Sequence, residues 1–335
     1  MTSRPDYPLV LSPHFSPRPW GGRGLETVLG KTLPANETVG ESWELSDHPN
    51  GKSTIQNGPL AGREFGELYQ KFPLEMVGTT EIPERFPLLV KFIDAQGDLS
   101  IQVHPNDLQA QKLGDRGKTE CWYVMDCEPE TEIIFGIKPG ITAEALRTGC
   151  TTGEVEGQVA SFPIQPNNFL FVRAGTVHAI RGGTLICEIQ QASDTTFRLW
   201  DWNREPNREL HIEESIEAID WNSAAAEPII VPPVGMLTEP QLLAENEFFS
   251  VVAVDVDEEE STLPGTGESG QIVVVLQGEG HIHQGYNNVE IHKGQTIYIP
   301  ALIADEVLLQ ANQGSTLRLL VAESKELQTL QQQTP

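Results

Sequence analysis

Short apolar segments recur along this chain about every ten to twenty residues, separated by glycine, proline or polar residues. Most have the length of a β-strand and are too short for a typical helix. The chain also contains 30 glycines and 24 prolines, which favour frequent turns. In the first two thirds the predicted strands are 87–93, 99–103, 121–125, 132–135, 169–173 and 185–190. This pattern predicts a mainly β protein.

A few short helices are expected between the strands. In 62–71, Leu68 and Tyr69 follow Phe65 by three and four residues, which places these apolar side chains on one face of a helix. The segment 142–148 begins with threonine and an acidic first turn, which is a helix start signal. A third helix is predicted after His211, where several acidic residues follow.

The strand pattern starts again after residue 233. The predicted strands of this second series are 248–255, 271–276, 280–283, 289–292, 296–299 and 316–321. Between the two series, 224–233 is rich in alanine, proline and valine and has no periodicity. We therefore predict two domains, 1–225 and 234–326, and a frayed polar tail at 327–335.

Acidic residues dominate the charge, since 48 acidic against 22 basic residues give a net charge of −26. Nucleic acid is not expected as a partner, because its phosphates would be repelled. No apolar run of about 18 residues predicts a membrane span, and no secretory segment is apparent. The four cysteines form no C-x-x-C pair, so we expect a cytoplasmic protein. A monomer and a homodimer both remain open.

Four polar side chains lie in or beside the predicted strands of the first series. Gln102 and His104 are two residues apart on one strand, so both side chains point to the same face. Glu120 opens another strand, and His178 follows a glycine-bearing turn. Two imidazoles, a carboxylate and an amide oxygen are a ligand set for a divalent ion such as zinc. We therefore predict a metal site in the first domain.

The turn before His178 has a counterpart in the second series. Residues 167–178 align with 294–305, where Leu302 replaces Gly175 and Asp305 replaces His178. This element resembles the second motif of the cupin jelly roll, with Asn167 and Arg173 in place of its usual glycine and proline. The resemblance implies two cupin-like jelly-roll barrels, the second degenerate and without its metal. His281 and His283 in that second copy are interpreted as a polar surface pair.

Longer strings in the first domain resemble type I mannose-6-phosphate isomerases in their short bacterial form. They are 99–107, 117–124, 175–180 and 191–201, with 40–44 and 48–51 as additional matches. The resemblance implies one zinc ion held by Gln102, His104, Glu120 and His178. It also implies a catalytic role for Arg198 and places Ser100, Lys118 and Glu188 at matching positions of the family's site.

The implied reaction interconverts mannose 6-phosphate and fructose 6-phosphate by proton transfer through an enediol. It requires a base near the C2 hydrogen and positive charge near the developing oxyanion. Arg198 supplies charge and bidentate donors, and Glu188 and Lys118 are unranked candidates for proton transfer. The phosphate needs cations that outweigh the acidic surface locally. Candidates for substrate binding are Ser100, Lys91, Lys118 and Arg198.

Two alternatives from other classes remain open. Two histidines and a carboxylate can also hold iron and activate oxygen, as in metal-dependent oxygenases of the cupin type. A non-catalytic sugar-phosphate-binding protein would retain the same side chains but show no turnover. Metal analysis with an oxygen-uptake assay tests the first alternative, and a coupled isomerase assay tests the second.

Overall fold

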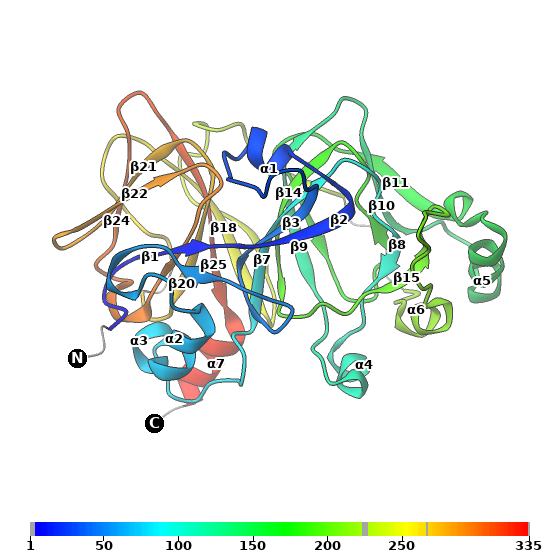
Figure 1. The fold of residues 1–335 in the computed structure, drawn as a ribbon, viewed down its shortest axis with the longest axis horizontal. Helices are drawn as coiled ribbons and strands as arrows, with labels where there is room; N and C mark the ends of the chain where they lie inside the picture. Colours follow the sequence, from blue (N-terminus) through cyan, green and yellow to red (C-terminus); the bar gives the residue numbers. More distant parts are fainter. Residues whose placement is uncertain (1–3, 223–226, 266, 334–335) are drawn as a thin grey trace.

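The computed structural model describes residues 4–222, 227–265 and 267–333. The chain is mainly β, and its strands form two halves that lie side by side (Figure 1). Each half has a seven-stranded sheet and a smaller one, of five strands in the first half and four in the second. A two-stranded ribbon completes the sheets. The predicted mainly β fold is confirmed, and the paired sheets of each half are consistent with a jelly roll.

The first half contains the predicted strands of the first series. Its large sheet has the spatial order β16 (Ile229–Ile230), β12 (Asn168–Val172), β9 (Glu120–Cys127), β14 (Thr184–Gln191), β7 (Leu88–Ala95), β3 (Val39–Leu45) and β2 (His14–Gly22). Its small sheet has the order β11 (Val159–Pro163), β10 (Glu132–Ile137), β13 (His178–Ala179), β8 (Ile101–Val103) and β15 (Phe197–Trp200).

The second half is built in the same way. Its large sheet has the order β17 (Gln241–Glu245), β18 (Phe249–Val256), β25 (Leu317–Ser324), β20 (Gln271–Gln277), β23 (Thr296–Ile299), β1 (Leu9–Ser12) and β6 (Thr54–Ile55). Its small sheet has the order β19 (Ser261–Thr262), β24 (Leu308–Ala311), β21 (Glu279–Gln284) and β22 (Asn287–His292). The ribbon pairs β4 (Asp47–His48) with β5 (Gly51–Lys52).

The three helices predicted from the sequence are present. They are α2 (Phe65–Lys71), α5 (Ala143–Thr152) and α6 (Ile212–Ala218). Thr142 caps α5 by accepting a hydrogen bond from the amide of Ala145 at 3.2 Å. Four further helices are α1 (Gly24–Thr27), α3 (Pro73–Val77), α4 (Asp107–Ala110) and α7 (Lys325–Gln333).

The prediction of a frayed polar tail from residue 327 is wrong for the described part of that segment. Residues 325–333 form α7, which lies beside α2 and α3 in Figure 1. Leu327 is buried, and Gln328 donates a hydrogen bond to Glu323 at 3.0 Å. Arg116 also forms an ion pair with Glu326 at 2.6 Å. The Arg116–Glu326 pair joins residues 210 positions apart, so the local polar composition did not reveal it.

The N-terminal strand crosses between the halves. β1 lies in the range predicted for the first domain, but it pairs with β23 of the second half and with β6. The predicted linker is 226–233, and residue 226 lies outside the described part of the chain. The linker contains β16, which pairs with β12 of the first half. The division into 1–225 and 234–326 therefore stays a prediction.

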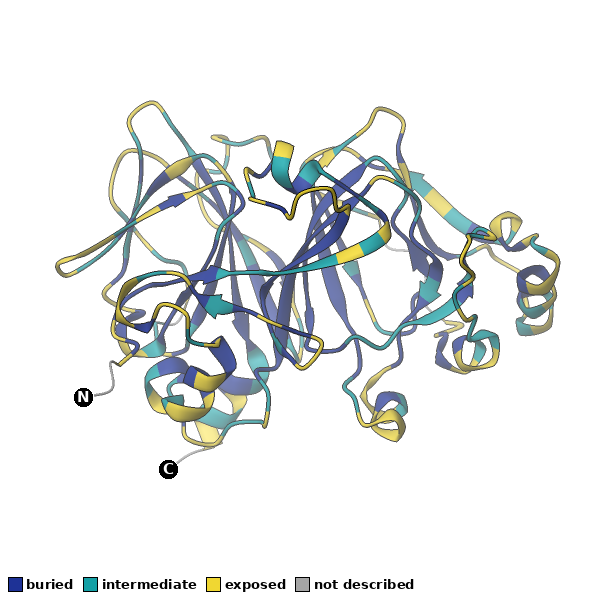
Figure 2. Cartoon of the chain, viewed as in Figure 1, coloured by how far each residue is buried: buried dark blue, intermediate teal, exposed yellow. Residues whose placement is uncertain are grey.

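The largest hydrophobic cluster lies between the two large sheets. Phe92, Tyr123 and Cys187 from the first half share it with Ile272 and Leu320 from the second. Figure 2 shows the central strands of both sheets as continuously buried. Side chains alternate along a strand, so the residues between these positions point the other way, into the first half. Glu120, Trp122 and Glu188 therefore face the interior where the predicted site lies.

Candidate metal centre and active site

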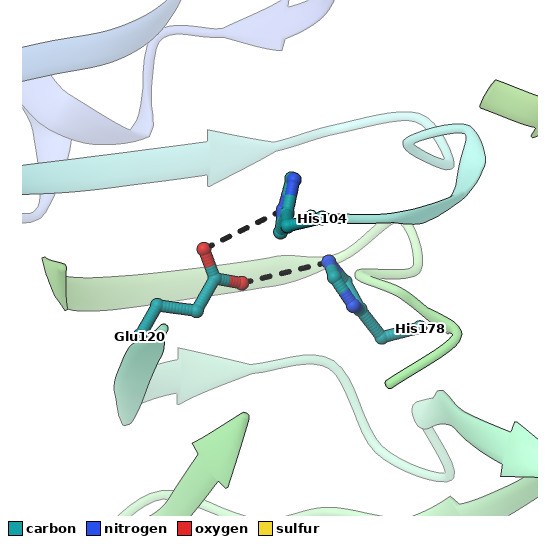
Figure 3. A group of neighbouring side chains, drawn as sticks. All are labelled: His104, Glu120 and His178. Carbon is teal, nitrogen blue, oxygen red and sulfur yellow. Dashed lines mark ion pairs between the residues drawn. The ribbon is translucent and has the colours of Figure 1, made fainter. Parts of the chain in front are cut away.

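Three predicted ligands meet inside the first half. His104 Nε2 lies 3.6 Å from Glu120 Oε2, and His178 Nε2 lies 3.5 Å from Glu120 Oε1 (Figure 3). All three side chains are buried, and their ligand atoms lie within 4.8 Å of one another. Within the described residues, this is the one such group of three metal-binding side chains. The tertiary structure thus brings together residues that are 74 positions apart in the sequence.

Local sequence places each of these ligands. β8 ends at Val103, because Pro105 follows His104 and Asn106 caps α4 through a reciprocal bond with Gln109. Gly175 has φ +87°, and a Cβ there would lie 3.0 Å from the carbonyl oxygen of Ala218. This turn therefore requires glycine, and it leads directly into His178.

The imidazoles are oriented for a metal ion. His104 Nδ1 lies 3.0 Å from the carbonyl oxygen of Thr195, and His178 Nδ1 lies 2.9 Å from that of Thr176. A ring nitrogen bound to a carbonyl carries the proton, which leaves the Nε2 lone pairs directed toward Glu120. Burial lowers the pKa of His178 to about 4 and that of His104 well below its usual value. Both rings are thus neutral, as a ligand must be.

Glu120 supplies the negative charge of the group. Both of its carboxylate oxygens are buried, and Oε1 has no hydrogen-bond donor among the described residues. Lys118 Nζ lies 3.0 Å from Glu120 Oε2 as an ion pair and 3.2 Å from His104 Nε2. A buried carboxylate without hydrogen-bond donors is costly unless a cation offsets it. The two imidazoles and this carboxylate therefore fit a divalent metal ion.

Gln102 lies at the edge of the metal-binding group. Its backbone pairs with that of His178, and its side-chain Nε2 lies 3.2 Å from His178 Nε2. Ser100 Oγ donates a hydrogen bond to Gln102 Oε1 at 3.1 Å. Half a turn of the amide exchanges its oxygen and nitrogen and would direct the oxygen toward the group. The assignment of Gln102 as fourth ligand stays a proposal.

Glu188 stands beside this group on β14, paired with Trp122 and Lys91 on the neighbouring strands. Trp122 Nε1 donates to Glu188 Oε2 at 3.0 Å, whereas Oε1 accepts no hydrogen bond from the described residues. Lys91 and Lys118 lie 3.7 and 3.9 Å from Oε1. Burial, followed by the charge of Glu120, raises the pKa of Glu188. A carboxylate with a raised pKa and one open oxygen is suited to proton transfer.

Arg198 differs from the other cations because its side chain makes no hydrogen bond or ion pair within the described residues. Its backbone pairs with Gln102 between β15 and β8, and its Nε is buried. Burial and the neighbouring Arg208 lower the pKa of Arg198. An uncommitted guanidinium beside a buried cavity is available to an anionic ligand.

Glu188 and Arg198 line a single cavity of about 140 Å³. It contains all the sequence-predicted positions outside the metal-binding group, which are Lys91, Ser100, Gln102, Lys118, Glu188 and Arg198. Gln102 and Lys118 line the cavity and also contact the metal-binding group. The metal-binding group therefore adjoins the cavity where a substrate would enter.

Comparison with known proteins gives the family. The model of the phosphomannose isomerase type I catalytic domain matches residues 9–139, and that of the mannose-6-phosphate isomerase cupin domain matches residues 239–312. A protein of Bacillus subtilis named probable mannose-6-phosphate isomerase GmuF is 36% identical over 303 residues, which cover 88% of this chain and 94% of that protein. The chain belongs to the type I phosphomannose isomerase family.

Solved structures of this family have the same fold. The mannose 6-phosphate isomerase of Bacillus subtilis superimposes with a TM-score of 0.83 at 33% identity, covering 94% of this chain and 99% of that one. A mannose 6-phosphate isomerase bound with zinc and yttrium shares the fold, with a TM-score of 0.71 at 16% identity over 95% and 99% of the two chains. The family match gives no support to the oxygenase or to the non-catalytic binding protein.

Several cavity residues of this family member were not predicted from the sequence. They are Arg18, Glu41, Asp194, Thr196 and Arg208. Glu41 lies in one of the matched strings, 40–44, and Arg18 stands two residues before Trp20. No periodicity or spacing marked Arg208, because it follows an irregular segment after β15. Trp20 is buried and also lines the cavity.

The second half has no comparable arrangement among the described residues. The rings of His281 and His283 stack on each other, with centroids 5.7 Å apart. His281 Nδ1 lies 3.0 Å from Asn288 Oδ1, and His283 Nε2 lies 3.2 Å from Gln310 Oε1. Both histidines therefore have polar partners of their own on neighbouring strands. None of the described helices, in either half, is long and apolar enough to cross a membrane.

Proposed function

We propose that this chain is a metal-dependent aldose-ketose isomerase that interconverts mannose 6-phosphate and fructose 6-phosphate. The observation that carries the proposal is the buried His104, Glu120 and His178 group beside a cavity that holds an open carboxylate and an uncommitted guanidinium. Membership of the type I phosphomannose isomerase family supports the same activity.

The proposed cofactor is one zinc ion held by His104, Glu120, His178 and Gln102. Nitrogen and oxygen ligands of this kind suit zinc, although other divalent metals bind such sets as well. When bound, the ion would supply positive charge that polarises the oxygens of the sugar. The carbonyl partners of both imidazoles already hold the rings in the required tautomer.

We assign the proton transfer to Glu188. Its side chain lines the cavity, and its Oε1 has no hydrogen-bond donor among the described residues, so this oxygen is free to take a proton from one carbon and return it to the next. Lys118 is committed to Glu120 and His104 by short contacts, so its proposed role is to supply charge and a donor near the reacting carbons. Arg198 supplies charge that stabilises the oxyanion of the enediol.

Ser100, Lys91, Lys118 and Arg198 are the proposed substrate-binding residues named from the sequence, and all four line the cavity. Lys91 is buried between two acids, with Glu41 at 3.8 Å and Glu188 at 3.7 Å. Its charge is therefore shared with these carboxylates. Lys91 Nζ also lies 4.8 Å from the centroid of the Trp43 ring. The sugar phosphate as partner and the cytoplasm as location remain part of this proposal.

Metal analysis paired with a coupled isomerase assay tests the proposal. The purified protein should contain about one equivalent of zinc and should convert mannose 6-phosphate into fructose 6-phosphate. Chelator treatment should remove metal and activity together, and added zinc should restore both. A fully active preparation without bound metal would contradict the role of the metal. Tight substrate binding without turnover would instead support a binding protein.

A further inference from the structure

The segment 117–119 carries Lys118 into the cavity, but it lies outside any strand. β9 begins at Glu120, and its pairing with β14 runs no further than Glu120, which lies opposite Gln190. The regular ladder therefore stops one residue short of this segment. Lys118 nevertheless has a defined position, with Nζ 3.0 Å from Glu120 and 3.9 Å from Glu188. Another contact must hold the segment in place.

Gln191, the last residue of β14, supplies that contact. Its backbone N–H donates to the carbonyl oxygen of Thr119 at 3.1 Å, and its side-chain Oε1 accepts a hydrogen bond from the Thr119 N–H at 2.9 Å. One residue thus satisfies both backbone groups of Thr119, in place of a continuing strand. Gln191 is only 3% exposed, so water does not compete for these hydrogen bonds.

The other end of the Gln191 amide is anchored as well. Its Nε2 donates to Asp107 Oδ1 at 3.1 Å, and the same oxygen accepts a hydrogen bond from the Gly117 N–H at 2.8 Å. A Cβ on Gly117 would lie 2.5 Å from the backbone nitrogen of Asp107, so this close approach requires glycine. The segment 117–119 is therefore held at both ends by the side chains of Gln191 and Asp107.

These hydrogen bonds join segments that carry the site. Asp107 and Gln191 each lie three residues after a functional side chain, His104 and Glu188 respectively. Thr119 lies between a lysine that lines the cavity and the carboxylate of the metal-binding group. A shift of the Thr119 backbone would therefore move both of these neighbours relative to Glu188.

We propose that Gln191 is a positioning residue that holds Lys118 and Glu120 in the geometry needed for metal binding and proton transfer. This inference rests on the proposed isomerase function. Gln191 does not line the cavity, so its role is not contact with the substrate. Its loss should therefore affect metal affinity and kcat more than KM.

The test compares Gln191→Leu with Gln271→Leu as a matched control. Gln271 is 1% exposed and lies in the second half, where its Nε2 donates to the carbonyl oxygen of Pro264 at 2.7 Å and to Glu323 at 3.1 Å. Each substitution keeps a similar volume and removes two side-chain hydrogen bonds, so the two should cost similar stability. Zinc affinity is measured by chelator competition, and kcat and KM are measured at saturating zinc. The visible spectrum of bound cobalt(II) reports the geometry at the metal.

Gln191→Leu should weaken zinc binding about 10- to 100-fold and alter the cobalt spectrum. Its kcat should fall by at least about tenfold, because small displacements of groups that act on the reacting atoms are costly. Gln191→Glu keeps an acceptor for the Thr119 N–H and should recover most of the lost kcat. Gln271→Leu should retain the zinc affinity, kcat and cobalt spectrum of the unmodified protein, despite a similar fall in melting temperature.

An unchanged cobalt spectrum and kcat in folded Gln191→Leu, or an equal loss in Gln271→Leu, would overturn the proposal. If Gln191→Leu does not fold, Asp107→Ala takes its place, because it removes an exposed acceptor of the same network. Unchanged zinc affinity and kcat in Asp107→Ala would then overturn the proposal. Zinc affinity that falls in Gln191→Leu of a protein without isomerase activity would instead refute the proposed function and retain the positioning role.

Discussion

The sharpest prediction concerns Arg198, because its substitution should affect activity and stability in opposite ways. Arg198→Met keeps an unbranched side chain that replaces the aliphatic part of arginine but removes the charge. The native guanidinium is half-buried, has a buried Nε without a partner, and lies near two other arginines. Folding therefore removes part of the guanidinium from water without a direct ion pair to a carboxylate, although Asp201 and Asp194 act on its charge from a distance.

The expected magnitudes differ in sign. Loss of a donor to a developing oxyanion costs about 10²- to 10³-fold in kcat, or roughly 3–4 kcal/mol of transition-state stabilisation. The free energy of unfolding should not fall, and it should rise by up to about 2 kcal/mol, since a half-buried charge without an ion pair is removed. Metal content should stay unchanged, because the Arg198 side chain forms no ion pair or hydrogen bond with His104, Glu120 or His178 in the described part of the chain.

Arg318→Met provides the matched control. Arg318 is fully buried, but it is paired with Asp255 and also donates to Tyr123 at 3.0 Å. Its removal leaves a buried carboxylate unpaired and should cost about 3–5 kcal/mol. Urea unfolding with kinetic assays measures both effects. If Arg198→Met lowered stability as much as Arg318→Met, or kept full kcat, the reasoning about an uncommitted charge would be refuted.

Three further predictions address the ligands and the cavity charges. His178→Ala should lose metal and activity together, and the melting temperature should no longer respond to added zinc. Asp115→Ala should weaken metal binding about 10- to 100-fold in a chelator competition. Asp115 accepts hydrogen bonds from the hydroxyls of Ser193 and Thr195, and the Thr195 carbonyl in turn orients His104. As a control, Arg85→Gln removes an ion pair with Asp115 at 3.7 Å and should bind metal normally. Burial alone would raise the pKa of Glu41, but the cations of Lys91 and Arg18 lower it to about 2, so its stabilisation is present above its ordinary pKa of about 4.5 and is lost as the pH falls toward 2. The difference in unfolding free energy between the unmodified protein and Glu41→Gln should therefore shrink over that interval, and a constant difference would contradict the assigned ion pairs.

Short-range patterns predicted the elements of this fold because their causes are local. The apolar runs at 87–93 and 185–190 became β7 and β14, and the threonine at 142 became the cap of α5. α7 escaped prediction because its stability comes from packing of Leu327 and from the pair of Arg116 with Glu326, over 200 residues apart. Polar composition says nothing about such partners.

The candidate site shows the same division. Gln102, His104, Glu120 and His178 could be named in advance because alternation along a strand and a glycine turn are readable from neighbouring residues. Asn167 can replace the usual glycine of the cupin motif, since it adopts φ +71°, a conformation that asparagine reaches more readily than most residues.

The sequence by itself determined the alternating strands, the turns and the identity of the side chains able to bind a cation. Only the tertiary structure decided that Arg18 and Arg208, 190 positions apart, line the same cavity as Glu188. It also decided which charges are paired and which stay open. The physical reason is that strand pairing and burial depend on distant segments, and these set both the distances between charges and the cost of removing each one from water.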